Sequence, residues 1–180
     1  MQLVLPPLRR TSEDAAKFAA AIHQEITQDA ASLMAHLARV AAMVERISDG
    51  CPFWKGDHRD DAIEVAWLHH VITDGEIDTR TLRREGFSRI VVDDVEALSA
   101  ADGPCHENWL RALAENADLT TILVKMADIR DERSESQLSS ISCDDVVGFK
   151  INYEQIESEL IEVARSKGWE GDLDLLLRTN

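Results

Sequence analysis

Aromatic residues and positive charges are scarce in this chain of 180 residues. Only 5% of the residues are aromatic, which argues against a β-sandwich or a barrel, because strands favour aromatic and β-branched side chains. The 19 lysines and arginines are outnumbered by 34 aspartates and glutamates, and the formal net charge is −15. Such a surface repels nucleic acid and anionic membranes, so we expect neither as a partner. A small phosphorylated ligand is still compatible with this charge if a bound cation reverses the local field.

Cysteine is rare as well, and long apolar runs are missing. The three cysteines are Cys51, Cys105 and Cys143. Their number is odd and no two are spaced as CxxC, which argues against a disulfide framework or a cysteine-zinc site and favours the reducing cytoplasm. The opening "MQLVLPPLRR" is interrupted by prolines and arginines, so it does not resemble a signal peptide. No run reaches the length of a membrane-spanning helix.

Alanine, leucine and helical periodicity dominate the rest of the chain, and they predict an all-α fold. The length suits a single domain, a helical bundle over residues 1–180 with a core at about 12–166 and a C-terminal extension at 167–180. Asp78 or Thr79 is expected to cap the helix at 78–87, and Gly86 to end it. Gly168 is expected to end the helix at 152–168. We predict seven to nine helices, over 11–26, 30–47, 62–72, 78–87, 88–98, 106–113, 118–133, 152–168 and 172–178, with polar loops at 52–61 and 134–145.

Three residues are unusual because they interrupt apolar helical faces: His36, His69 and Asp128. Taken singly, such a histidine is most often a core residue bonded to a carbonyl, and Asp128 has Lys125 and Arg130 nearby as partners. A buried carboxylate does require a partner, a cation or a metal. Together the three supply the nitrogen and oxygen donors that a hydrolytic divalent metal uses. Three helices of a bundle are able to direct them into one interior site.

Four short segments carry a resemblance to a known family. The chain contains "AAKFAAAIHQ", "HLARVAAMV", "AWLHHVITDG" and "LVKMADIRDE" in that order, between about Ala15 and Glu132. This series resembles the HD-domain metal-dependent phosphohydrolases, and more narrowly the RelA/SpoT-type hydrolases of guanosine tetraphosphate. The resemblance implies a divalent metal, manganese by family, and hydrolysis of a phosphate ester or pyrophosphate bond in a small phosphorylated ligand, with a guanine nucleotide as one candidate.

The resemblance also implies roles for individual residues. The metal ligands would be His36, His69, His70 and Asp128. The contacts to phosphate would be Arg39, Lys125 and Arg130, which lie within about a turn of these ligands. The catalytic pair would be Thr73 and Asp74, which stand where the family carries a Glu-Asp pair.

Three positions depart from the family pattern. His70 replaces an aspartate, so either three histidines and one aspartate bind a metal, with preference moving towards zinc, iron or nickel, or His70 turns away. Thr73 replaces a glutamate and cannot accept a proton at neutral pH, which leaves Asp74 as a substitute. Glu132 replaces an asparagine and, with Asp131, repels an anionic ligand. We therefore expect an active phosphohydrolase with a modified site; the alternative is a catalytically degenerate HD protein that binds a ligand or a protein partner. Exposed helical faces are compatible with a homodimer.

Overall fold

Seven α-helices and one short 3₁₀ helix form the described part of the chain, and no strand occurs in it, so the predicted all-α class is confirmed. The computed structural model describes residues 9–26, 29–54, 56–75, 77–99, 113, 115, 117–138 and 153–171. The elements are α1 (Ser12–Ile26), α2 (Ala30–Ile47), η1 (Ser48–Gly50), α3 (Gly56–Leu68), α4 (Thr79–Arg84), α5 (Arg89–Ser99), α7 (Leu119–Leu138) and α8 (Tyr153–Ser166). None of the helices among the described residues is both long and apolar enough to cross a membrane.

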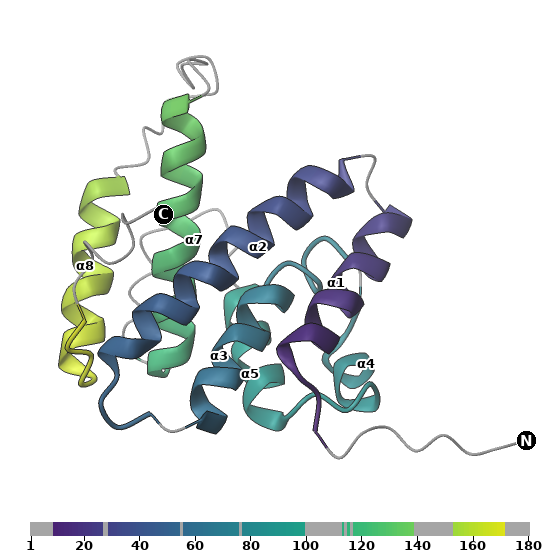
Figure 1. Ribbon diagram of the computed structural model, residues 1–180, viewed down its shortest axis with the longest axis horizontal. Helices are drawn as coiled ribbons and strands as arrows, with labels where there is room; N and C mark the ends of the chain where they lie inside the picture. The colour runs from purple at the N-terminus through teal and green to yellow at the C-terminus, as the bar shows by residue number, and fades with distance from the viewer. Residues whose placement is uncertain are drawn as a thin grey trace, which may run out of the picture.

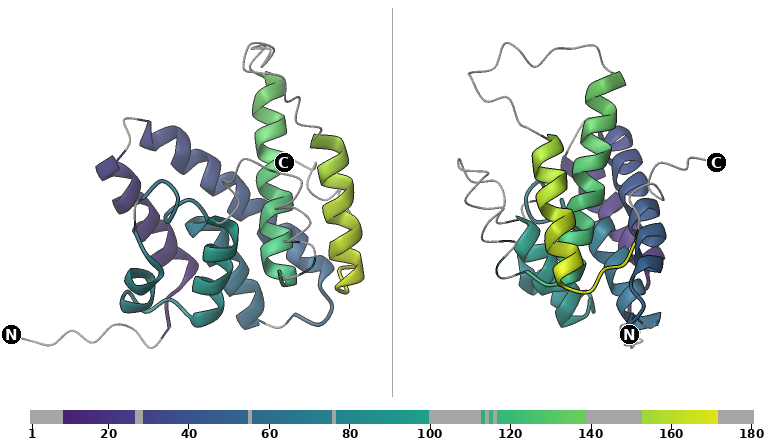
Figure 2. Two further views of the ribbon diagram at one scale, coloured as in Figure 1. Left: turned by 180° about the vertical axis from the view of Figure 1, so that it is seen from behind. Right: turned by 90° about the vertical axis from the view of Figure 1, so that its left-hand side faces the viewer.

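Helix α2 runs across the middle of the bundle and contacts α1, α3 and α7 (Figure 1). Helix α8 packs antiparallel against α7 at one side of the molecule, while α1, α4 and α5 lie towards the other side (Figure 2). Helix α3 lies between the two groups, because it contacts α1, α2, α5 and α7. Helices α2 and α7, which carry His36 and Asp128, and helix α3, which precedes the histidine doublet, are therefore neighbours.

The core is built from helical stripes of the kind predicted for residues 30–47. In α2, Leu37, Val40 and Val44 are fully buried at three- and four-residue spacing. Helix α7 contributes Ile122 and Met126, which are also fully buried. Each such side chain stabilises the fold by roughly 1.5–3 kcal/mol relative to its exposed state. This packing fixes α2 and α7 against each other along the face that carries the site.

Two helix boundaries differ from prediction. Helix α3 begins at Gly56 inside the predicted loop 52–61 and ends at Leu68 rather than at residue 72. Asp57 stabilises its first turn through the helix dipole. Helix α7 continues to Leu138, so the predicted loop 134–145 was wrong for its first five residues. The hydroxyl of Ser134 donates to the carbonyl of Arg130 at 2.9 Å, which lets a polar residue stay in the helix.

Other boundaries were predicted correctly. Asp78 caps α4 by accepting a hydrogen bond from the backbone N–H of Thr81, and Gly86 and Gly168 follow their helices with φ of 91° and 93°. The predicted helix at 172–178, the N-terminal segment 1–8 and most of the predicted helix at 106–113 lie outside the described residues, as does the rest of the predicted loop, 139–145.

The segment after α8 is tied to the end of α2. Trp169 is 2% exposed, and its indole N–H donates to the carbonyl of Ile47 at 3.0 Å. The backbone N–H of Glu170 donates to the carbonyl of Gly50 at 2.8 Å. Gly50 and Gly171 approach so closely that a Cβ on Gly50 would lie 2.4 Å from the Cα of Gly171. Residues 169–171, which the sequence analysis placed in an extension, are therefore packed against the core.

Candidate metal centre

The structure brings together four predicted residues, His36, His69, His70 and Asp128. One ligand atom from each lies within 4.8 Å of the others. His36 comes from α2, Asp128 from α7, and the histidine doublet from the turn that follows α3. The Oδ1 atom of Asp128 lies 3.3 Å from Nε2 of His36 and 3.6 Å from Nε2 of His69. The convergence expected from three helices is present, but His69 lies in the turn after α3 and not on a helix as predicted.

The end of α3 at Leu68 explains how two adjacent histidines enter one site. In a continuous α-helix, adjacent side chains diverge by about 100°. Residues 69–75 form turns instead, closed by the N–H of Val71 on the carbonyl of Leu68 at 2.9 Å. The rings of His69 and His70 are consequently only 4.4 Å apart, and both lie beside His36, at 5.6 and 5.5 Å between centroids.

Each histidine has an acceptor near its Nδ1 atom, hydrogen-bonded at His36 and His69 and in contact at His70. Nδ1 of His69 lies 2.7 Å from the carbonyl oxygen of Ala66, which can only accept, so this nitrogen carries the proton. Nδ1 of His36 lies 2.8 Å from the carboxylate of Asp131, and Nδ1 of His70 lies 3.3 Å from that of Asp74. An imidazole held in this way presents Nε2 as the ligand atom, which is the usual arrangement at metal sites.

Asp128 is also oriented by a neighbouring side chain. The Nζ atom of Lys125 donates to its Oδ2 at 2.7 Å, so Oδ1 faces the histidines. Burial raises the pKa of Asp128, but attraction to His36 and His69 outweighs it and holds this pKa well below its usual range. Asp128 is therefore an ionised carboxylate although only 3% of the residue is exposed.

The pKa values of the histidines differ with their neighbours. Burial, reinforced by the adjacent His69, lowers the pKa of His70 to about 3, so this imidazole is neutral. Burial also lowers the pKa of His36, but Asp128 and Asp131 reverse that effect and the net shift is upward. A neutral imidazole is the form that binds metals. His70 is therefore ready to act as a ligand, whereas a metal must compete with a proton at His36.

The donor set fits a divalent transition metal. Nε2 of His36, Nε2 of His69 and Oδ1 of Asp128 are buried and have no hydrogen-bonding partner in the described part of the chain. Buried polar atoms without partners are costly, and a ligand that satisfies them relieves this cost. Ligands at 2.0–2.1 Å around a tetrahedral ion lie about 3.3 Å apart. The two separations from Oδ1 of Asp128, 3.3 and 3.6 Å, are close to this value, and all four donor atoms lie within 4.8 Å of one another.

The three predicted phosphate contacts all form ion pairs with carboxylates. Arg39 binds Asp131 through Nε at 2.7 Å and Nη2 at 2.8 Å. Lys125 binds Asp128, as described above. Arg130 donates to Glu157 of α8 at 2.7 Å, and the carboxylate of Glu157 is only 9% exposed. In this structure Arg130 therefore joins α7 to α8, and the other two cations support residues of the cluster.

The predicted catalytic pair lies in the turn that carries the histidine doublet. Thr73 is exposed. The side chain of Asp74 is 41% exposed, and its carboxylate contacts His70. Glu132 is an exposed residue one turn beyond Asp128 on α7, and partial desolvation and the Asp128 carboxylate raise its pKa.

Asp131 has a role that the sequence analysis missed. We expected it to repel an anion, but it accepts hydrogen bonds from Arg39 and His36. A signal was present in the spacing. Arg39 follows His36 by three residues, and Asp131 follows Asp128 by three, so each pair lies on one helix face. The spacing places Arg39 on the His36 face of α2 and Asp131 on the Asp128 face of α7, and the packing of the two helices then brings them together.

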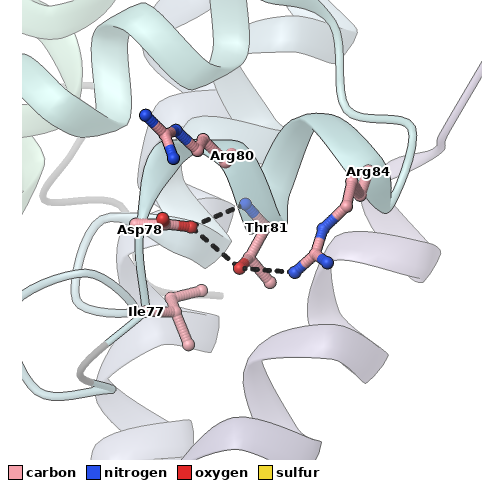
Figure 3. Close-up of a pocket in the computed structure, with 5 residues that line it drawn as sticks. All are labelled: Ile77, Asp78, Arg80, Thr81 and Arg84. Carbon is pink, nitrogen blue, oxygen red and sulfur yellow. Dashed lines mark hydrogen bonds between the residues drawn. The ribbon is translucent and has the colours of Figure 1, made fainter.

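An open pocket of about 500 Å³ lies at α4 and contains none of the clustered residues (Figure 3). Its lining is Ile77, Asp78, Arg80, Thr81 and Arg84. The carboxylate of Asp78 accepts from the N–H and the hydroxyl of Thr81, both at 2.9 Å, and Arg84 donates to the same hydroxyl at 3.3 Å. These bonds serve the capping of a short helix.

Comparisons of the chain with protein-family models, with curated proteins and with solved structures returned no match.

Proposed function

We propose that the chain is a metal-dependent phosphohydrolase of the HD-domain type that acts on a small phosphorylated compound, with a guanine nucleotide as the first candidate. The observation that supports this most is the convergence of three imidazole nitrogens and one carboxylate oxygen within 4.8 Å. The resemblance of the four ordered sequence segments supplies the class of reaction.

The charge of the cluster suits a phosphorylated substrate. When bound, a divalent cation supplies Lewis acidity towards a phosphoryl oxygen. Asp128 is the single carboxylate among the four grouped residues, so the cation keeps part of its positive charge. Lys125 adds a further positive charge at Asp128. This local field offsets the formal charge of −15 on the whole chain.

We assign proton transfer to Glu132 and a supporting role to Asp74. Glu132 is exposed and lies one turn beyond Asp128 on the same helix. Asp74 contacts His70, so its carboxylate serves to orient that ring. A positioned acid–base group typically contributes about 10²- to 10⁴-fold in rate. Glu132→Gln should therefore lower kcat by about that factor in steady-state assays with metal-loaded protein.

In this proposal the metal is zinc, iron or nickel, and not the manganese that the resembled family uses. Three imidazoles and one carboxylate form a softer donor set than the oxygen-rich sites that manganese prefers. Parallel loading with Mn²⁺ and Zn²⁺, followed by dialysis and elemental analysis, compares the two ions directly. Tighter retention of Mn²⁺ than of Zn²⁺ would contradict this assignment.

Elemental analysis of protein purified without chelators tests the proposal. We expect stoichiometric transition metal that is lost in His69→Ala and Asp128→Ala. His58→Ala is the matched control, because His58 is an exposed histidine outside the cluster. If the wild-type chain contains no metal and cannot be loaded with Mn²⁺ or Zn²⁺, the proposal is wrong. If it is loaded, turnover is then measured with guanosine tetraphosphate, nucleoside monophosphates and pyrophosphate esters.

A second candidate is a degenerate HD protein that binds a ligand or a protein partner without turnover. The contact between Asp74 and His70 favours it, because the substitute for the missing glutamate already has a partner. This candidate predicts metal binding and guanine-nucleotide binding by calorimetry, with no product formed in the same samples. Release of phosphate or pyrophosphate that depends on the metal would exclude it.

A further inference from the structure

We infer that Asp131, held in place by Arg39, is a positioning residue that fixes the ring and the tautomer of His36 for metal binding. This inference rests on the proposed function, since it concerns the same metal centre. It also changes the role expected for Arg39, from a phosphate contact to the outer member of a chain of three side chains. The chain runs from Arg39 through Asp131 to His36.

The Asp131 carboxylate is fully engaged by these two partners. Its Oδ1 accepts from Nε of Arg39 at 2.7 Å, and its Oδ2 accepts from Nη2 of Arg39 at 2.8 Å and from Nδ1 of His36 at 2.8 Å. The Asp131 side chain is only 5% exposed. A two-point arginine–carboxylate pair is both strong and directional. The guanidinium therefore fixes the plane of the carboxylate, and the carboxylate fixes the direction of the imidazole N–H.

The consequence for His36 is that one nitrogen is selected as the ligand atom. Because Nδ1 donates to Asp131, Nε2 is left to face Oδ1 of Asp128 at 3.3 Å. A carboxylate on the far nitrogen also makes the imidazole a more basic ligand. Without Asp131 the ring is free to turn, and either nitrogen is then able to carry the proton.

Three groups contact the Nδ1 atoms of the histidines: the carbonyl of Ala66, Asp74 and Asp131. Asp131 is the one best suited to a test. His69 is held by a backbone carbonyl, which substitution does not remove. His70 has a 3.3 Å contact with Asp74, whose side chain is 41% exposed. Asp131 is a buried side chain with a shorter contact. Its substitution therefore tests how much the orientation of the His36 ring contributes to metal binding.

The first measurement is the Kd for Zn²⁺ by chelator competition at one fixed pH. Asp131→Ala should weaken binding about 10- to 100-fold. Asp131→Asn should weaken it less, because its amide oxygen still accepts from His36, and Arg39→Met should fall between wild type and Asp131→Ala. Glu157→Gln is the matched control: it alters another buried carboxylate that pairs with arginine, yet it lies at the α7–α8 contact. Its Kd for Zn²⁺ should equal that of the wild type.

The second measurement does not need metal. Long-range ¹H–¹⁵N correlation spectra of metal-free protein, taken at alkaline pH where the imidazole is neutral, report which nitrogen of His36 is protonated. We expect protonation at Nδ1 in the wild type and in Asp131→Asn, and a mixture of tautomers in Asp131→Ala. If Asp131→Ala does not fold, Asp131→Asn and Arg39→Met still provide the comparison of Kd.

The inference is overturned if Asp131→Ala, or the two milder variants in its place, binds Zn²⁺ as tightly as the wild type. It is also overturned if the wild-type His36 is protonated at Nε2. If the wild type binds neither Zn²⁺ nor Mn²⁺, the proposed function fails, while the tautomer of His36 still decides whether Asp131 positions the ring. The two failures are therefore distinguishable.

Discussion

Asp94 is a buried carboxyl group that should make the protein less stable as the pH rises above neutrality. The residue is 5% exposed, and its Oδ1 accepts from the hydroxyl of Thr121 at 2.7 Å. Its Oδ2 is buried without a hydrogen-bonding partner in the described residues. Burial, followed by repulsion from Asp118, raises the pKa of Asp94 to about 8. Burial also raises the pKa of Glu64, with repulsion from Asp61, to about 7.

The direction in which the free energy of unfolding changes with pH follows from proton binding. Between their unfolded-state pKa values near 4 and their raised folded-state pKa values, both groups bind a proton only in the folded protein. The free energy of unfolding therefore falls with pH, by up to about 1.4 kcal/mol per pH unit for each group. His23 and His70 have lowered pKa values and act in the opposite direction below about pH 6.5. The raised pKa of His36 acts in the same direction as the two carboxyl groups above that pH. The clearest window is about pH 6.5–8, where Asp94 and Glu64 together should remove about 2 kcal/mol of stability.

Urea unfolding of metal-free protein, followed by circular dichroism across that window, provides the assay. Asp94→Asn should keep the bond from Thr121 but show a clearly smaller pH dependence than the wild type, and it should be more stable than the wild type at pH 8. Asp93→Asn is the matched control, because Asp93 is adjacent but about half exposed and pairs with Arg83 and Arg89. A wild-type stability that does not change across the window would refute the reasoning. So would an Asp94→Asn variant with the wild-type slope.

Three further predictions concern the packing and the metal. Trp169→Ala should cost about 3–5 kcal/mol in urea unfolding, because it leaves a cavity and the carbonyl of Ile47 without its donor. Glu157→Ala should cost about 3 kcal/mol in the same assay, because Arg130 and Arg133 then lose a shared buried partner. Zn²⁺ at 100 times its Kd should stabilise the wild type by about 2.7 kcal/mol in thermal unfolding, and should not stabilise His69→Ala.

Much of the fold could be predicted because local patterns and packing agree. The stripe of Leu37, Val40 and Val44 is helical in spacing and buried in the structure. Gly86 and Gly168 follow their helices with the positive φ that glycine tolerates. The end of α3 was not predicted, because Val71 and Ile72 continue an apolar pattern past Leu68. The backbone turns there although the side-chain periodicity does not mark the change.

The residues of the cluster could be predicted from the sequence, but the hydrogen bonds that orient them could not. His36, His69 and Asp128 were recognisable because polar residues interrupt apolar faces. The groups that orient the histidine rings were harder to predict. One is a backbone carbonyl, and the contact of another, Asp131, is formed only because of how α2 and α7 face each other. Sequence spacing gives the face of a helix, whereas the partner across an interface depends on tertiary packing.

The turn at residues 69–75 concentrates two of the four clustered donors in a single short segment. It also contains Asp74, and its backbone is closed by the N–H of Asp74 on the carbonyl of His70 at 2.9 Å. Gly75 ends the turn with no room for a side chain, because a Cβ there would lie 2.1 Å from the carbonyl oxygen of Val71. One local opening of this segment would remove both donors at once, without unfolding the bundle. We therefore expect the residence time of a bound ion to follow the opening rate of this turn, and a chelator to strip the ion far faster than the protein unfolds.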